Sequence, residues 1–292
     1  MTQNSQEEHK NNDTSSISFT AHYTGYVWVA NELSHPSFAT LKGQAFYTAL
    51  RGPQWLARRI SSLNLDAVLL ARHTLIDLQL ERAINSGAIT QIIEIASGLS
   101  PRGWRFAERH GDAIEYIEAD LPAMAQRKRD LLKNAGLDSA NHRVVDIDAF
   151  SDDCPLSLNT LISTLDRRKG TAIITEGLIN YFDTNSVIGL WGRIADALGH
   201  MQRGIYLSDI HLGNLGNDLA SKAFMKMLSR FVRGQVHLHF DGEASAEQAL
   251  LLSGFGSAHL LRPRDFAERL PYCREKGVNQ VRVIAARTGS WD

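Results

Sequence analysis

Short apolar segments alternate with amphipathic segments of helical periodicity from about Ile89 onward. The apolar segments are predicted strands, at Gln91–Ala96, Ala113–Glu118, His142–Ile147, Thr171–Thr175 and Gly204–Ser208. Between them lie predicted helices, at Arg102–His110, Pro122–Ala135, Leu156–Arg167 and Thr184–His200. Strands that alternate with helices in this way form βαβ units, in which a parallel sheet carries helices on both faces. The crossovers of such units are right-handed.

The end of the chain follows a different pattern. Ser257–Leu261 and Val278–Ala286 are predicted strands, and Pro263–Leu270 is a predicted short helix between them. No long helix follows, so we expect these last strands to pair antiparallel, as a hairpin-like edge. The predicted fold class is therefore α/β, with a Rossmann-like sheet that is mostly parallel and has an antiparallel last strand.

The region before the sheet is predicted to be helical. Short amphipathic pieces at Ala45–Leu50 and Gln54–Ile60 precede a longer helix at Leu65–Ile84, which Gly87 ends as a C-cap. The first residues contain no apolar stretch, and we expect a disordered tail there. The predicted organisation is a tail at 1–16, a helical cap at 17–88 and one α/β domain at 89–292.

Composition argues against several classes of function. Of 292 residues, 43% are hydrophobic, which supports a sizeable core. Lys and Arg number 31 against 32 for Asp and Glu, and no basic stripe indicates nucleic acid. Cys154 and Cys273 form no CxxC motif, which favours a reducing compartment over a disulfide framework or a zinc site. The sequence has no long apolar span and no signal peptide, so we expect a cytoplasmic protein without a membrane segment.

The first predicted strand ends in a turn that suits a ligand. The strand passes into Ser97-Gly98, and a helix begins near Arg102. Glycine lets the backbone approach a ligand closely, and a helix N-terminus offers N–H groups to a carboxylate or phosphate. The motif is not GxGxxG, so it supports a dinucleotide poorly. A Ser-Gly turn after a strand is also common as plain structure.

Acidic residues follow the next three strands. Asp120 lies at about the 20-residue separation from Gly98 at which such folds place a ribose-binding acid. The alternative is that Asp120 caps the helix that opens at Pro122. Asp148 follows the third strand, beside the adenine pocket in a sheet of this order, and Glu176 follows the fourth. Ligands of open α/β sheets bind outside the carboxyl ends of the strands, so this series predicts a ligand site there.

These pieces together resemble the leucine carboxyl methyltransferase family, which includes protein phosphatase methylating enzymes and tetracenomycin-type polyketide O-methyltransferases. The matching segments follow the family's order, at Arg72–Asp77, Gly98–Arg102, Glu118–Pro122, Lys128-Arg129, Val145–Asp148 and Glu176–Phe182. The resemblance implies the class I methyltransferase fold and S-adenosylmethionine as the cofactor. The turn reads Ala96-Ser97-Gly98 where family members commonly have Gly-Ala-Gly. The segments that select the methyl acceptor match poorly, so the resemblance does not identify the acceptor.

The resemblance also implies a set of cofactor contacts. It places the arginine that pairs with the methionine carboxylate at Arg72, and a guanidinium fork suits a carboxylate. The sequence pattern alone would leave Arg72 on the surface of an amphipathic helix. The resemblance further implies a glycine-turn contact at Gly98, a ribose contact at Asp120, an adenine-side contact at Asp148 and a contact near the methionine end at Glu176.

The expected methyl acceptor is an oxygen of a small molecule or peptide. A carboxylate is already ionised and needs no base, whereas a phenol or alcohol needs one. The candidate catalytic residues are Tyr181, beside the Glu176 loop, and His211, just past the fifth strand. His237 and His239 alternate on a strand-like run, but no clear third ligand accompanies them, and we expect a paired exposed face and no metal site.

Two other functions are weighed against this one. An NAD-dependent oxidoreductase uses a similar sheet, but the missing GxGxxG motif and the antiparallel ending count against it. A non-catalytic regulatory protein would keep the fold and bind S-adenosylmethionine without transferring its methyl group. The sequence therefore predicts an S-adenosylmethionine-dependent O-methyltransferase, with these two alternatives.

Overall fold

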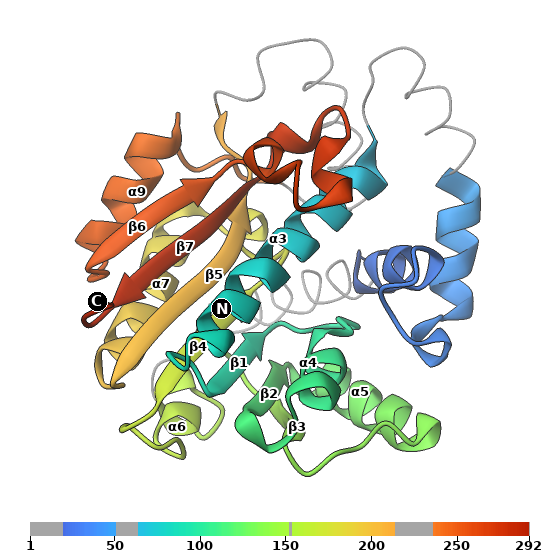
Figure 1. Ribbon diagram of the computed structural model, residues 1–292, viewed down its shortest axis with the longest axis horizontal. Coiled ribbons are helices and arrows are strands. Elements are labelled where there is room, and N and C mark those ends of the chain that lie inside the picture. Colours follow the sequence, from blue (N-terminus) through green and yellow to red (C-terminus); the bar gives the residue numbers. More distant parts are fainter. Residues whose placement is uncertain (1–19, 51–63, 152–153, 214–235, 292) are drawn as a thin grey trace, which may run out of the picture.

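The computed structural model describes residues 20–50, 64–151, 154–213 and 236–291, which contain a seven-stranded sheet (Figure 1). The strands are β1 (Gln91–Ile95), β2 (Glu115–Asp120), β3 (His142–Asp146), β4 (Gly170–Thr175), β5 (Arg203–Ile210), β6 (Ser257–Leu261) and β7 (Arg282–Thr288). Their order is β3-β2-β1-β4-β5-β7-β6. Strands β1 to β5 pair parallel, and β7 is antiparallel to both of its neighbours. The order reverses between β1 and β4, which is where open α/β sheets bind ligands.

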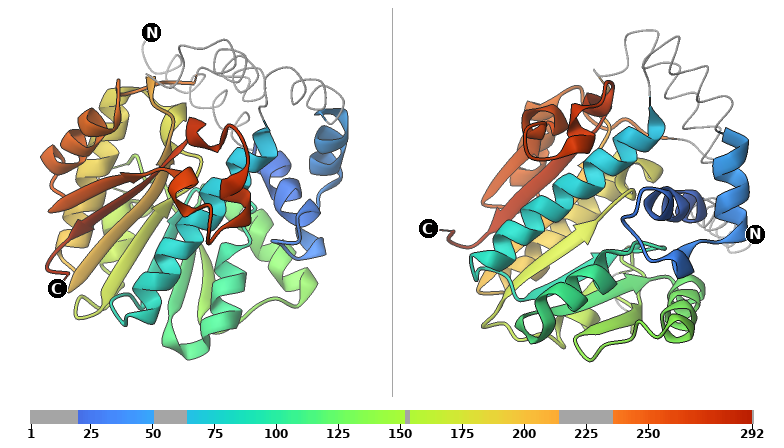
Figure 2. Two further views of the ribbon diagram at one scale, coloured as in Figure 1. Left: turned by 45° about the horizontal axis from the view of Figure 1, so that its top comes forward. Right: turned by 45° about the vertical axis from the view of Figure 1, so that its right-hand side comes forward.

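Helices cover both faces of the sheet (Figure 2). On one face, α3 (Leu65–Asn85) and α4 (Arg102–His110) share a hydrophobic cluster with strand residues. On the other face, α6 (Leu158–Ile162), α7 (Thr184–Gly199) and α9 (Glu243–Leu252) form a second cluster with the strands. A further helix, α5 (Pro122–Ala135), contacts β2 and β3. Because both faces are covered, all six residues of β4 are buried, and its sequence shows no polar alternation.

The N-terminal region contributes two helices, over residues 20–30 and 41–50, with the 3₁₀-helix η1 (Pro36–Phe38) between them. Figure 2 shows these helices (blue) beside α3. Tyr23 and Trp28 pack against the first half of α3, and the Tyr23 hydroxyl donates to Asp66 at 2.8 Å. The second half of α3 packs on the sheet, so α3 joins the N-terminal helices to the sheet.

The expected α/β fold class is confirmed, but the position of the antiparallel strand differs from the expectation. β7 lies between β5 and β6, so that β6 forms the edge of the sheet. The strand also begins later than expected, because Val278–Gln280 form the 3₁₀-helix η7 after Gly277, whose φ of 83° is left-handed. The division into tail, cap and sheet domain stays a prediction. Residues 1–16 and the expected helix at Gln54–Ile60 lie outside the described residues.

Several helix bounds also differ from the expectation. The helix expected at Leu156–Arg167 is shorter, since Ser157 caps α6 by accepting from the Thr160 N–H, and α6 ends at Ile162. The segment expected as the helix Pro263–Leu270 holds only the 3₁₀-helix η5 (Pro263–Phe266). Helix α9 occupies a stretch in which the sequence analysis had placed no element.

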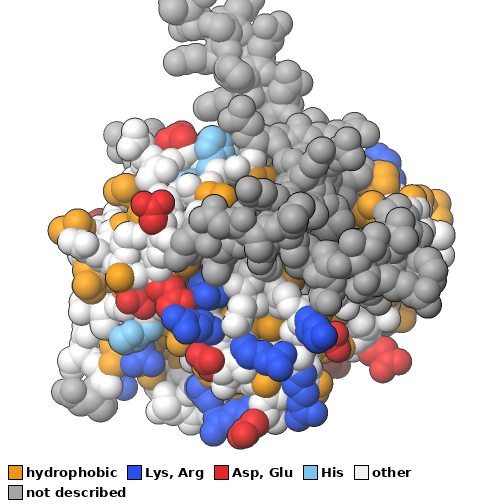
Figure 3. Space-filling model, turned by 90° about the horizontal axis from the view of Figure 1, so that it is seen from above, with side chains coloured by type: hydrophobic (Ala, Val, Ile, Leu, Met, Phe, Trp, Pro, Cys, Tyr) orange, Lys and Arg blue, Asp and Glu red, His pale blue; other side chains and the backbone are white. Residues whose placement is uncertain are grey.

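Two observations on the described residues concern membranes and nucleic acid. None of the described helices combines the length and the apolar character that crossing a bilayer requires. On the face shown in Figure 3, basic and acidic side chains are interspersed, with hydrophobic ones scattered among them. Mixed charges of this kind do not form the continuous basic face that nucleic-acid binding favours.

We predict that Gly170→Ala destabilises the fold. A Cβ at Gly170, the first residue of β4, would overlap the carbonyl oxygen of Ala88. Overpacking of this kind costs about 1–3 kcal/mol in the free energy of unfolding, measured by urea denaturation. Gly192 on α7 is the matched control, because a Cβ there meets nothing within 4 Å. Gly192→Ala should stabilise the helix by about 0.5–1 kcal/mol, and equal effects of the two substitutions would contradict the prediction.

Candidate functional site

A cavity of about 540 Å³, counting its open mouth, lies at the carboxyl ends of β1 and β4. Four segments line it, comprising Thr20, Ala21, Thr24 and Trp28; Arg72 on α3; Glu94 and residues 96–100; and residues 176–178 with Tyr181. Of the residues predicted to contact a cofactor, the structure brings Arg72, Gly98 and Glu176 together in this cavity.

The turn after β1 is tightly folded. Ala96 and Gly98 both have left-handed backbones, with φ of 54° and 51°. This conformation costs a residue such as Ala96 about 1–2 kcal/mol, whereas glycine adopts it readily. A Cβ at Gly98 would lie 3.2 Å from the Cβ of Ala21, because the helix over residues 20–30 packs directly on the turn. Strain of this kind accumulates at ligand sites and supports a functional role for the turn.

Asp120 holds the glycine turn to β2. Its Oδ2 accepts from the Gly98 N–H at 2.7 Å, and its Oδ1 accepts from the Leu121 N–H at 2.8 Å. Burial raises the pKa of the Asp120 carboxyl, while the two N–H donors favour its ionised form. The alternative that Asp120 caps the following helix is wrong, because Leu121 is the N-cap of α5 and no side chain caps it. The ribose contact at Asp120 stays a prediction.

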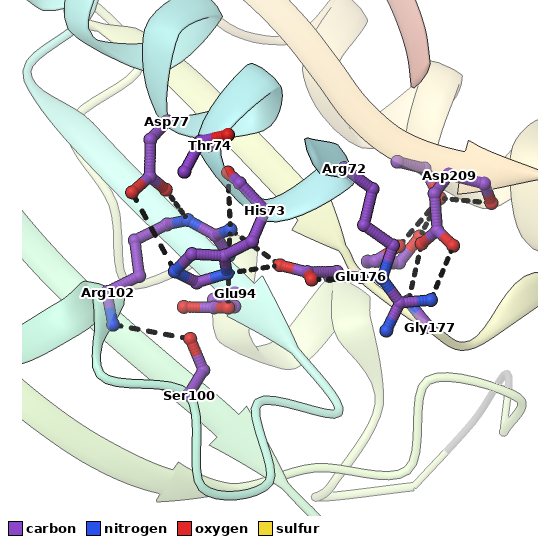
Figure 4. Close-up of polar contacts among 12 residues, drawn as sticks. Arg72, His73, Thr74, Asp77, Glu94, Ser100, Arg102, Glu176, Gly177 and Asp209 are labelled. Atoms are coloured by element: carbon purple, nitrogen blue, oxygen red, sulfur yellow. Dashed lines mark hydrogen bonds and ion pairs between the residues drawn. The ribbon is translucent and has the colours of Figure 1, made fainter. Parts of the chain in front are cut away.

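A buried ion network lies beneath the cavity and is centred on Arg102 (Figure 4). The Arg102 side chain is fully buried, and each of its three nitrogens pairs with a different carboxylate at 2.6 Å, namely those of Asp77, Glu94 and Glu176. Tyr116 donates its hydroxyl to the other oxygen of Glu94 at 2.7 Å. One guanidinium thereby joins α3, β1, α4 and the loop after β4.

Glu176 connects this network to the cavity. Its Oε2 lies 2.8 Å from Nδ1 of His73, and its Oε1 lies 3.2 Å from Nε of Arg72. Burial would raise the pKa of the Glu176 carboxyl, but His73 and the two arginines hold it well below its ordinary value of 4.5. Glu176 is therefore ionised at neutral pH and fixes the orientation of Arg72.

Arg72 is buried, not exposed as its helical pattern alone would suggest. Its Nη1 pairs with Asp209 at 2.8 Å, and the other oxygen of Asp209 accepts from the Gly177 N–H at 2.6 Å. Gly177 is left-handed, with φ of 70°, and a Cβ there would lie 2.9 Å from Nη2 of Arg72. The hydrogen bonds of Arg72 to the described residues use Nε and Nη1. Nη2 makes no hydrogen bond to a described residue, and Arg72 lines the cavity.

A second cavity, of about 320 Å³, adjoins the first. Both cavities are lined by Arg72, Gly177 and Tyr181, and the second is completed by Asn180, Asp209, His211 and Val236. The structure therefore brings both candidate catalytic residues, Tyr181 and His211, next to the predicted cofactor residues. Burial raises the pKa of the Tyr181 phenol, which stays protonated, and burial lowers the pKa of the His211 imidazole.

The remaining predicted residues lie elsewhere. Asp148 does not line either cavity, and its Oδ1 accepts from the Phe150 N–H at 3.1 Å in a turn. His237 and His239 stack with their ring centroids 6.2 Å apart, on a segment without strand structure and half-buried. In the part of the chain that the structure describes, no group of three or more His, Cys, Asp or Glu residues is arranged to hold a metal ion.

The sequence analysis missed two residues of this site. Asp209 follows Ser208 near the carboxyl end of β5, where the rule that identified the acids after the earlier strands also applies. Arg102 was identified only as the start of a helix, and its burial depends on carboxylates from three other segments. No local pattern indicates such a partner set.

A family model for leucine carboxyl methyltransferases matches residues 32–195. A candidate S-adenosyl-L-methionine-dependent methyltransferase of Mycolicibacterium vanbaalenii is 33% identical over 110 residues. That match covers 37% of this chain and 34% of the relative, so the chain spans about a third of the length of this curated relative.

Solved structures share the fold. A candidate methyltransferase of Thermobifida fusca superposes with a TM-score of 0.63 at 13% identity, covering 94% of both chains. A protein of Streptomyces avermitilis from the DUF574 family gives 0.59 at 12% identity, covering 93% of this chain and 97% of that one. A candidate O-methyltransferase of Nostoc punctiforme gives 0.51 at 14% identity, covering 76% and 60%. This is the fold of class I S-adenosylmethionine-dependent methyltransferases.

We predict that Arg102→Met lowers the free energy of unfolding by about 3–5 kcal/mol at neutral pH, because it leaves buried carboxylates unpaired. Urea denaturation measures the loss, and Arg168→Met is the control, since Arg168 is exposed and its ion pair among the described residues is with Asp166, in the loop before β4. The depressed pKa of Glu176 contributes stability that is complete above about pH 4.5 and is lost as the pH falls below it. The difference between parent and Arg102→Met should therefore narrow below pH 4.5. A loss no larger than that of Arg168→Met would contradict the prediction.

Proposed function

The chain belongs to the leucine carboxyl methyltransferase family, and we propose that it transfers the methyl group of S-adenosylmethionine to an oxygen of a small molecule or peptide. S-adenosylmethionine is the cofactor of this family. The observation that carries the proposal is the cavity at the ends of β1 and β4, which combines a strained glycine turn with a buried arginine.

The residues around the cavity fit this cofactor. Arg72 would hold the methionine carboxylate through Nη2, and the turn at Gly98 would lie against the cofactor without a Cβ. Glu176 lines the same cavity as an ionised carboxylate and would attract the cofactor's ammonium group. Asp120, which is bonded to the Gly98 N–H, retains lone pairs for the ribose hydroxyls. The adenine-side role of Asp148 rests on its position after β3 alone.

The cofactor supplies an electrophilic methyl group on a positively charged sulfur. The chain's own contribution is to position the reactants and exclude water, which together can account for most of the acceleration of an in-line transfer. The helix over residues 20–30 covers the glycine turn, and its Trp28 lines the cavity while being 5% exposed. Arg72 is fixed between two carboxylates and so holds its position with little freedom to lose on binding.

The acceptor class and the location are proposed from the surface charges and the cysteines. The acceptor is proposed to be a small molecule or peptide, not nucleic acid, since basic and acidic side chains alternate on the surface of Figure 3. A cytoplasmic location is proposed from the cysteines, because Cys154 and Cys273 are both free thiols.

The alternative function is a non-catalytic protein that binds S-adenosylmethionine. Transfer of labelled methyl groups to an acceptor would exclude this alternative, and binding without any transfer would favour it.

Calorimetry tests the cofactor assignment. We expect S-adenosylmethionine and S-adenosylhomocysteine both to bind. The two compounds share the amino-acid end that would contact Arg72, Gly98 and Glu176. NAD should give no heat of binding, since the turn has no GxGxxG motif for a pyrophosphate. Binding of NAD without binding of either S-adenosyl compound would overturn the proposal.

Arg72 is expected to be the main anchor of the cofactor carboxylate. Arg72→Ala should weaken binding of S-adenosylhomocysteine by about 1.5–3 kcal/mol, the range for a hydrogen bond to a charged group. Arg72→Lys should retain part of the affinity, because an ammonium keeps the charge and loses the planar fork. The matched control is Arg82→Ala, on the same helix, where Arg82 lies over the Phe266 ring and away from the cavity. Circular dichroism verifies folding, and unchanged affinity in a folded Arg72→Ala protein would place the anchor elsewhere.

A further inference from the structure

Two buried polar side chains of the first cavity have no hydrogen-bond partner among the described residues. They are the indole N–H of Trp28, on the helix over residues 20–30, and the hydroxyl of Ser97, in the glycine turn. Each residue is only 5% exposed, and both line the cavity. Native proteins pair nearly all of their buried polar groups, because an unpaired one that is shielded from water is costly. The two side chains therefore indicate that the cavity takes a ligand with polar groups of its own.

Trp28 lies beside the residues that would hold the amino-acid end of the cofactor. Its ring centroid is 4.7 Å from that of His73, which follows Arg72 on α3. The indole also belongs to the hydrophobic cluster that contains Val68 and Leu69 of the same helix. Apolar and ring packing therefore hold Trp28 against α3 near Arg72, without a hydrogen bond from the indole to a described residue.

The chemistry of an indole restricts what Trp28 can bind. An indole N–H only donates, so its partner must be a hydrogen-bond acceptor. At the amino-acid end of S-adenosylmethionine, the ammonium group only donates and the carboxylate only accepts. The carboxylate is therefore the group at that end which can pair with Trp28.

The cofactor carboxylate needs donors besides Arg72. Nε and Nη1 of Arg72 bond to Glu176 and Asp209, and these two carboxylates offset part of its positive charge. A carboxylate has about four lone-pair sites and is costly to bury unless they accept hydrogen bonds. Hydrogen bonds to an ionised group are stronger than those between neutral groups, so an indole N–H would stabilise this anion well.

We propose that the indole N–H of Trp28 donates a hydrogen bond to the carboxylate of the bound cofactor, which Trp28 and Arg72 hold together. This inference rests on the proposed function, because it adds a contact to the same cofactor site. It gives the helix over residues 20–30 a role in binding besides its packing on the glycine turn. The carboxylate is then held by two elements, through a cation on α3 and a neutral donor on the N-terminal helix.

Two ligands and one variant test this contact by calorimetry. S-adenosylhomocysteine carries the carboxylate, whereas decarboxylated S-adenosylhomocysteine keeps only the ammonium group, the sulfur and the adenosine. Trp28→Phe removes the N–H and keeps an aromatic ring against His73. The variant should bind S-adenosylhomocysteine about 10–150-fold more weakly than the parent, the range for a hydrogen bond to a charged group. Its affinity for the decarboxylated compound should stay close to that of the parent.

Trp291→Phe is the matched control. Trp291 donates its indole N–H to the carbonyl oxygen of Thr288 at 3.0 Å and lines neither cavity, so its substitution should leave both affinities unchanged. An unchanged affinity of Trp28→Phe for S-adenosylhomocysteine would overturn the contact. Equal losses with both ligands would also overturn it, because they would show that the indole contributes packing alone. A parent protein that binds neither S-adenosylmethionine nor S-adenosylhomocysteine would instead remove the proposed function.

NMR of the full chain labelled with ¹⁵N in tryptophan tests the contact in the parent protein, whether or not Trp28→Phe folds. The indole proton of Trp28, assigned through its backbone connectivities, should move downfield when S-adenosylhomocysteine saturates the site, because a hydrogen bond to a carboxylate deshields it. Decarboxylated S-adenosylhomocysteine should not cause this shift. An indole proton that keeps its position with saturating S-adenosylhomocysteine, or that moves equally with both compounds, would overturn the inference and leave the proposed function standing.

Discussion

The site depends on one buried cation. Arg102 is fully enclosed and pairs with three carboxylates from α3, β1 and the loop after β4. A guanidinium without such partners would be far too costly to bury, so each of these segments must reach its final position before the network is stable. The glycine turn lies between β1 and α4, and its shape therefore follows from the same interaction. Charge pairing beneath the cavity thus ties together segments that line it.

The network also explains how a helix before the sheet takes part in a site at the strand ends. α3 carries Arg72, His73 and Asp77, which all point toward the loop after β4 or toward Arg102 (Figure 4). Its first half packs on the helix over residues 20–30, whose Trp28 ring lies 4.7 Å from that of His73. Helix α3 thus connects the helix over residues 20–30, which lines one side of the cavity, to the ion network around Arg102 beneath it.

The parallel part of the sheet could be predicted from the sequence because its central strands, such as β1 and β4, are buried along their whole length and helices separate them. The acids at the strand ends followed from topology, since parallel strands end at one edge. Three features had no local signal. β7 inserts between β5 and β6 through non-local pairing, Arg72 is buried by partners more than 100 positions away, and α9 has weak amphipathic character. Asp209 was predictable by the rule for strand ends.

Arg72 lines both cavities. Its Nε and Nη1 are bound to carboxylates at the ends of β4 and β5, so its plane is set before any ligand arrives. Only the remaining donors can meet a ligand, and Gly177 keeps the space beside Nη2 clear. Under the proposed function, the guanidinium charge of Arg72 would therefore face one anion, the cofactor carboxylate, in the first cavity. The carboxylates of Glu176 and Asp209 that fix Arg72 also hold it at the wall of the second cavity, so a change at either carboxylate would alter both cavities.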